Sequence, residues 1–122
     1  AYSIALLNRV SYSGLIRRYS FDTADLSRET VKEKYPSANL FVERWSMTET
    51  EWNSFVDEII AEEIPFSDLD LALSRSELEL RLKAQIGKYI YGAEALYRVY
   101  NENDPMVKTA LDNINKSLSS LD

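Results

Sequence analysis

The residues of this chain that have the chemistry for catalysis are serines, lysines and carboxylates, because its 122 residues include no histidine and no cysteine. Histidine is the commonest general base and metal ligand, and the cysteine thiolate is another frequent nucleophile and ligand. Their absence excludes a Ser–His–Asp triad, a disulfide framework and a thiolate metal site. A serine activated by a lysine and a pair of carboxylates remain to be considered.

The serines do not occur in a pattern that is typical of a nucleophile. Fourteen serines and six lysines are present, yet no serine begins a Ser-x-x-Lys motif and none lies in a Gly-x-Ser-x-Gly turn. The three glycines, Gly14, Gly87 and Gly92, are isolated, so no glycine-rich loop is available to supply oxyanion donors or to hold a phosphate. We therefore expect no serine nucleophile in this chain and no bound cofactor.

Carboxylates are concentrated in residues 49–70, which we call the acidic stretch. It contains eight acidic residues and no lysine or arginine, whereas the rest of the chain contains 14 basic and 12 acidic residues. Asp68 with Asp70, and Glu62 with Glu63, are close enough in sequence to act as pairs. Acidic residues near helix starts more often cap the helix, and a calcium loop requires a central glycine that is absent here. The acidic stretch therefore predicts neither a catalytic pair nor a metal site.

Two groups of side chains are candidates for a binding or docking surface. The acidic stretch fits either a solvated helix face or a docking surface for a basic partner, and the second alternative would use Glu58, Glu62 and Glu63. Tyrosines flank Gly92 at helical spacing, and they fit either a ligand groove or a packed set of rings with hydroxyls at the rim. These tyrosines are Tyr89, Tyr91, Tyr97 and Tyr100.

Charge and hydropathy exclude two further classes of partner. The net charge is −6 and cations are not clustered, which argues against nucleic acid. No run of roughly 18 apolar residues is present, so we expect no transmembrane segment. The first ten residues, AYSIALLNRV, lack the features of a signal peptide, and a helical pattern is already established at Ile4. We therefore expect a processed chain or a piece excised from a longer protein.

Helices are expected to dominate the fold, because three glycines and three prolines are too few for the turns of an all-β domain. Apolar spacing predicts a helical segment over residues 3–34, with a break at Gly14 and a stop before Pro36. Residues 38–46, ANLFVERWS, alternate in character, and we expect an extended connector there that pins aromatic side chains into the core.

Start and stop signals predict four more helices. Thr48 with Glu51 is a capping-box pattern, and Ser67 with Asp70 is a further helix start signal. The predicted helices cover residues 49–62, residues 68 to about 92, residues 93–100, and a last segment that begins at Pro105. The sequence therefore predicts a single all-α domain over residues 1–122, with about five helices in an irregular bundle and a short extended connector near residues 40–45.

Two segments resemble a known family when they are taken in order. The first is GLIRRYSFDTADLSRETVKEKYPSANLFVERWSMTETEWNSFVDEI, and the second is SELELRLKAQIGKYIYGAEALYRVYNENDPMVKTALDNI. Together they resemble the C-terminal helical region of the carboxyl-terminal processing proteases, also called tail-specific proteases, of Bacteroidetes type. The first segment matches that family at Phe21, Asp22, Ala24, Arg28, Pro36 and Phe41.

The second segment carries the more continuous part of the resemblance. Its matching motifs are Leu82-Lys83-Ala84-Gln85-Ile86-Gly87-Lys88, Tyr97-Arg98-Val99 and Asp104-Pro105-Met106-Val107. The sequence departs from the family at Gly87, where alanine is usual, and at Tyr97, where a pair of aromatic residues is common. Neither departure affects a catalytic position.

The resemblance implies that this chain is an accessory C-terminal domain of a serine endopeptidase. The parent protein would have an upstream PDZ domain and a protease core with a serine nucleophile and a lysine base, and its substrate would be a protein or peptide. No position here matches those catalytic motifs, so the chain alone is expected not to be an enzyme. It would support the core, mediate self-association as a homo-oligomer, or position substrate, in the periplasm or cell envelope. The alternative is a free-standing helical binding module that uses the acidic stretch.

Overall fold

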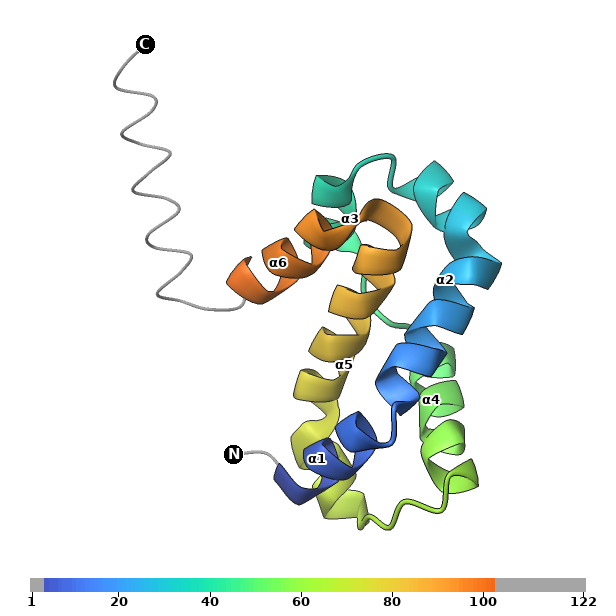
Figure 1. Cartoon of the computed structure of the whole chain (residues 1–122), viewed down its shortest axis with the longest axis vertical. Coiled ribbons are helices and arrows are strands. Elements are labelled where there is room, and N and C mark those ends of the chain that lie inside the picture. The colour runs from blue at the N-terminus through green and yellow to red at the C-terminus, as the bar shows by residue number, and fades with distance from the viewer. Residues whose placement is uncertain (1–3, 103–122) are drawn as a thin grey trace, which may run out of the picture.

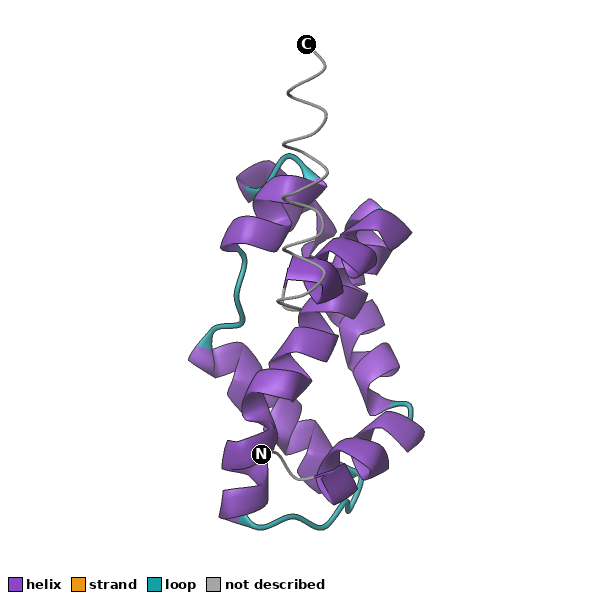
Figure 2. Ribbon diagram, turned by 90° about the vertical axis from the view of Figure 1, so that its left-hand side faces the viewer, coloured by secondary structure: helices purple, strands orange, loops and turns teal. Residues whose placement is uncertain are grey.

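The structure, a computed structural model, describes residues 4–102 as six helices without a strand among them (Figures 1 and 2). The predicted all-α class is therefore confirmed, and the predicted last helix from Pro105 lies outside the described residues. No helix within residues 4–102 is both long enough and apolar enough to cross a membrane. The helices are α1 (Ile4–Tyr12), α2 (Leu15–Lys34), α3 (Ala38–Arg44), α4 (Glu49–Ala61), α5 (Asp68–Tyr91) and α6 (Ala93–Glu102).

The long helix α5 is the centre of the arrangement. In Figure 1 it runs between α2 on one side and α6 on the other, and α1 lies near its first turns. Its closest partners are α2 and α6, and α6 folds back along α5 directly after Gly92. α2 and α6 therefore both pack against the same central helix.

The break between α1 and α2 occurs at Gly14, as the sequence predicts. Gly14 has a φ of 79°, which lies in the left-handed region where side chains other than that of glycine are strained. Ser13 supplies a local cap, because its Oγ accepts a hydrogen bond from the Leu15 N–H at 3.1 Å. The turn changes the chain direction between Ser11 and the start of α2.

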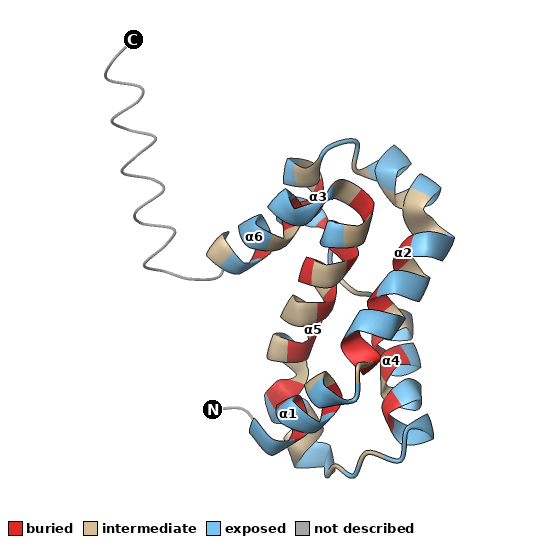
Figure 3. Cartoon of the chain, in the orientation of Figure 1, coloured by how far each residue is buried: buried red, intermediate tan, exposed pale blue. Residues whose placement is uncertain are grey.

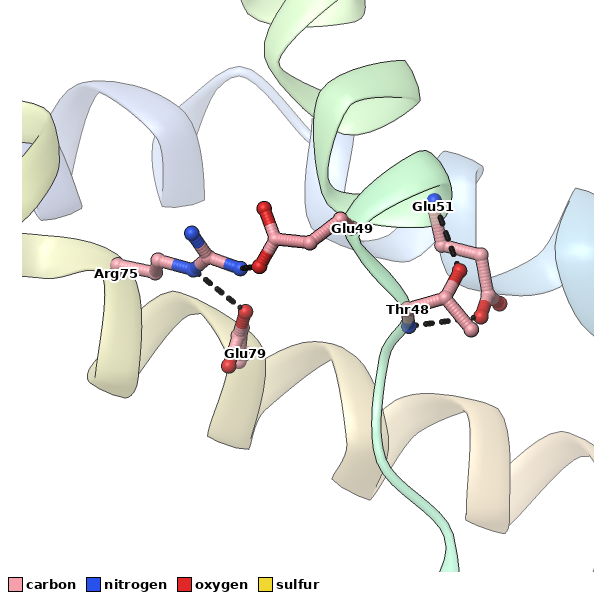
Figure 4. Close-up of polar contacts among 5 residues, drawn as sticks. All are labelled: Thr48, Glu49, Glu51, Arg75 and Glu79. Carbon is pink, nitrogen blue, oxygen red and sulfur yellow. Dashed lines mark hydrogen bonds and ion pairs between the residues drawn. The ribbon is translucent and has the colours of Figure 1, made fainter.

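The predicted capping box at Thr48 is present, and the predicted helix start at Ser67 also has one. The Thr48 hydroxyl accepts from the Glu51 N–H at 3.1 Å, and the Glu51 carboxylate accepts from the Thr48 N–H at 3.0 Å (Figure 4). Ser67 and Asp70 make the equivalent pair at the start of α5, at 3.1 and 3.2 Å. These caps satisfy backbone donors that no helical carbonyl can reach, so they fix the starts of α4 and α5.

The expected extended connector near residues 40–45 is wrong, because residues 38–44 form the helix α3. Ser37 caps this helix, with its Oγ accepting from the Leu40 N–H at 3.2 Å. Phe41 and Val42 are adjacent and both are buried, which an alternating strand does not allow but a helix packed on two sides does. The expected role of the segment is confirmed, since Phe41 and Trp45 are both in the core.

The core consists of two clusters that share α5, and the buried residues of that helix run from Ser74 to Ile90 (Figure 3). The first cluster joins α1, the start of α2, α4 and the first half of α5 around Leu7, Phe55 and Leu78. The second joins α3, α6 and the second half of α5 around Phe41. The Phe41 ring stacks on Trp45 at a centroid distance of 5.2 Å and lies 5.3 Å from the Tyr91 ring.

Gly87 allows α3 and α6 to approach α5 closely in the second cluster. A Cβ atom at this position would lie 3.0 Å from Cε1 of Phe41 and 3.2 Å from Cβ of Ala95. A hydrogen bond also links α3 to α5, because Nζ of Lys83 donates to the Val42 carbonyl at 2.6 Å. The absence of a side chain at Gly87 therefore sets the spacing of three helices.

Candidate functional site

Several carboxylates of the acidic stretch form hydrogen bonds or ion pairs with other residues of the chain. Glu51 and Asp70 are members of the two capping boxes, and the Glu62 carboxylate accepts from Arg18 of α2 at 2.6 Å. Glu49 forms an ion pair with Arg75. Four of the eight carboxylates thus have partners within the chain, and the surface that remains for a basic partner is smaller than the sequence suggests.

Arg75 of α5 links that helix to the start of α4, because it pairs with Glu49 of the acidic stretch (Figure 4). Its guanidinium donates to the Glu49 carboxylate and, at 2.9 Å, to Oε1 of Glu79, and it lies 4.9 Å from the centroid of a Trp52 ring. These hydrogen bonds, first that with Glu49 and then that with Glu79, raise the pKa of the Arg75 guanidinium. Arg75 is therefore a cation at neutral pH, and Glu49 of the acidic stretch serves as one of its counter-charges.

Glu58 and Glu63 are the candidate docking residues that remain without an ion-pair partner among residues 4–102. Both are exposed. Glu63 also has a structural peculiarity, a φ of 58°, at the end of α4. The Glu63 N–H donates to the Ile60 carbonyl at 2.9 Å and the Ile64 N–H donates to the Ile59 carbonyl at 3.3 Å, which is the Schellman arrangement.

Replacing Glu63 by glycine is expected to stabilise the chain by about 0.5–1 kcal/mol. A residue with a Cβ atom pays about 1–2 kcal/mol for the left-handed conformation, and the greater freedom of unfolded glycine offsets part of the gain. Chemical denaturation of the Glu63→Gly and Glu63→Ala variants would measure this difference, with alanine as the control that removes the charge but keeps the Cβ atom. Equal stability of the two variants would contradict the conformational cause.

The four tyrosines near Gly92 do not form one groove. Tyr89 packs edge to face on Phe21 of α2 at 5.4 Å, and the Tyr91 hydroxyl donates to the Tyr35 carbonyl at 2.5 Å. Burial raises the pKa of the Tyr91 hydroxyl, which keeps it protonated as a donor. The remaining two are the exposed Tyr97 and the half-exposed Tyr100, both on α6.

Tyr100 lines a pocket of about 350 Å³, the size range of small-molecule sites in proteins. The residues that line it come from the end of α1, the α1–α2 turn, the start of α2, α5 and α6. We call it the arginine pocket because two guanidinium groups line it. Its lining residues are Ser11, Gly14, Ile16, Arg17, Glu77, Arg81, Gln85 and Tyr100.

Arg81 is fixed in the arginine pocket by two neighbours. Its Nε donates to Oε1 of Glu77 at 3.2 Å, and one of its terminal nitrogens donates to Oγ of Ser11 at 2.8 Å. Burial raises the pKa of the Tyr100 hydroxyl, and Arg81 opposes this shift. Tyr100 is therefore a neutral hydrogen-bond donor beside a cation at neutral pH.

Sequence reasoning identified Tyr100 but missed Arg17, Arg81 and Gln85. The contact between Ser11 and Arg81 joins residues 70 positions apart, and no local motif links them. The arginines of the pocket come from separate helices that only the tertiary fold brings together. Within residues 4–102 no group of three or more acidic side chains is placed to hold a metal ion.

Comparison with known proteins gives one family. Residues 6–92, which run from within α1 to just past the end of α5 and so include five of the six helices, match the Family of unknown function (DUF8443). No curated protein and no solved structure matches the chain. Because the match covers most of the chain, this protein belongs to the family DUF8443.

Proposed function

We propose that this chain is a non-catalytic helical domain of a carboxyl-terminal processing serine protease in the periplasm or cell envelope. It would support the catalytic core, mediate self-association or position the protein substrate. The observation that carries the proposal is the resemblance of two ordered segments, residues 14–59 and 76–114, to the helical region of that family. The serine and lysine of the reaction would come from an upstream protease domain.

The packing of these segments supports the proposal. α2 and α3 belong to the first segment, and most of α5 and all of α6 belong to the second. α2 packs along α5, and Phe41 of α3 lies directly against Gly87 of α5. The described parts of the two segments therefore share one core, as is required of successive parts of one domain.

The coding region that precedes the codon for Ala1 tests this proposal. We expect it to encode a PDZ-like stretch followed by a protease core that contains the family's serine and lysine. The purified chain, incubated alone with an unfolded protein or with a peptide that ends in apolar residues, should cleave neither. A start codon with its own export signal a short distance upstream would contradict the proposal, as would cleavage that persists through purification to homogeneity.

The second candidate function is a free-standing helical module that binds a basic partner through the acidic stretch. The exposed side chains of Glu58 and Glu63 favour it, while the ion pair between Glu62 and Arg18 removes one of its expected residues. The same upstream sequence separates the two functions, because a free-standing module predicts a short gene.

A further inference from the structure

The arginine pocket has more positive charge than its own carboxylate neutralises. Arg81 is paired with Glu77 and Ser11, but its other terminal nitrogen has no partner within residues 4–102. The Arg17 side chain is exposed and forms neither an ion pair nor a hydrogen bond with another described residue. The pocket therefore presents two guanidinium groups and one carboxylate in a chain whose net charge is −6. Guanidinium groups bind carboxylates through strong, directional hydrogen bonds.

Two aromatic rings outside the pocket lining follow two of its lining residues by one helical turn. Phe21 follows Arg17 by four residues on α2, and so lies one turn further along the same helix face. Tyr89 follows Gln85 in the same way on α5. The Phe21 and Tyr89 rings meet edge to face at 5.4 Å, and Phe21 is 50% exposed. This spacing places an exposed aromatic side chain on the same face of α2 as Arg17, on the side toward which an apolar group next to a bound carboxylate could extend.

We infer that the arginine pocket binds the carboxylate of a ligand that carries an apolar or aromatic group next to it. The carboxylate would lie between Arg17 and Arg81, with the Tyr100 hydroxyl and the Gln85 amide as further donors. A single negative charge suits the pocket, because Glu77 already neutralises part of the charge of Arg81. The C-terminus of a peptide and a free carboxylic acid share this chemistry. The inference does not depend on the proposed role in a protease.

The test is an NMR titration of the full ¹⁵N-labelled chain with N-acetyl-phenylalanine and with its uncharged amide. We expect the acid to shift the backbone amides of Arg17, Arg81 and Gln85, and the amide to leave them unchanged at the same concentration. The Arg17→Gln variant should bind the acid about tenfold more weakly, as expected for loss of one charge-assisted hydrogen bond. Its melting temperature should not change, because Arg17 is exposed and unpaired within the described residues.

Arg44→Gln is the matched control, since Arg44 is an exposed arginine at the end of α3 and does not line the pocket. It should bind N-acetyl-phenylalanine as the unchanged chain does. A titration with N-acetyl-Ala-Ala-Phe identifies the source of the carboxylate: tighter binding indicates a peptide C-terminus, and equal affinity indicates a small carboxylic acid. Equal shifts from acid and amide, an absence of shifts at the pocket, or undiminished affinity in Arg17→Gln would each overturn the inference.

Discussion

Replacing Phe41 by alanine is expected to destabilise the chain by about 3–5 kcal/mol, the usual cost of truncating a buried phenylalanine. The ring is fully buried and lies against Trp45, Tyr91 and the backbone of α5 at Gly87. Its removal would leave a cavity where α3, α5 and α6 meet, and rigid aromatic neighbours cannot easily collapse into it. Domains of this size are typically stable by about 5–15 kcal/mol, so urea denaturation followed by circular dichroism should show a large shift of the midpoint.

Phe21→Ala is the control for this prediction, because it makes the same chemical change at a ring that is 50% exposed. Its expected cost is about 1–2 kcal/mol, from partial burial and the edge-to-face contact with Tyr89. If the two substitutions cost the same, Phe41 is not the centre of the second core cluster.

Replacing Gly87 by alanine is expected to destabilise the chain by up to about 2 kcal/mol, the reverse of the usual effect. Alanine inside a helix normally stabilises by about 1 kcal/mol relative to glycine. Here the added methyl group would lie 3.0 Å from Phe41 and 3.2 Å from Ala95, and overpacking of a core costs about 1–3 kcal/mol. Because Cβ of Ala95 is attached directly to the α6 backbone, the helix itself would have to move. Thermal unfolding of the variant measures the net effect.

A second substitution separates the steric cause from other effects of Gly87→Ala. Phe41→Leu removes part of the ring that meets the new methyl group, so the double variant should lose less stability than the sum of the two single variants. Stabilisation by Gly87→Ala would show that α6 adjusts its position at little cost, and simple additivity would exclude the contact with Phe41 as the cause.

The helices that the sequence predicts correctly are those whose signals are local. The capping boxes at Thr48 and Ser67 and the glycine turn at Gly14 each depend on residues within a few positions, so their patterns are visible without the fold. α3 was missed because seven residues are too few to establish a helical period. The available signal was Ser37 directly after Pro36, a residue type that commonly caps a helix.

The binding features were harder to predict because they depend on distant pairs. Glu62 is paired with Arg18 and Glu49 with Arg75, and no sequence pattern predicts either ion pair. Tyr100 was found from its place in an amphipathic helix, whereas Arg17 and Arg81 become neighbours of one pocket only when α2 packs on α5. Local spacing identifies single surface residues, and tertiary packing decides which of them act together.

Both core clusters contain residues of α5, and a cut in the backbone before this helix would therefore affect both. Residues 63–66, between α4 and α5, form an accessible connection, with Glu63 and Pro65 both exposed. A nick there would separate α1–α4 from α5–α6, and neither fragment would retain a whole core, since each cluster draws residues from both sides of the cut. The two fragments would therefore require each other to fold, and a version of this chain expressed as two polypeptides should reconstitute by complementation.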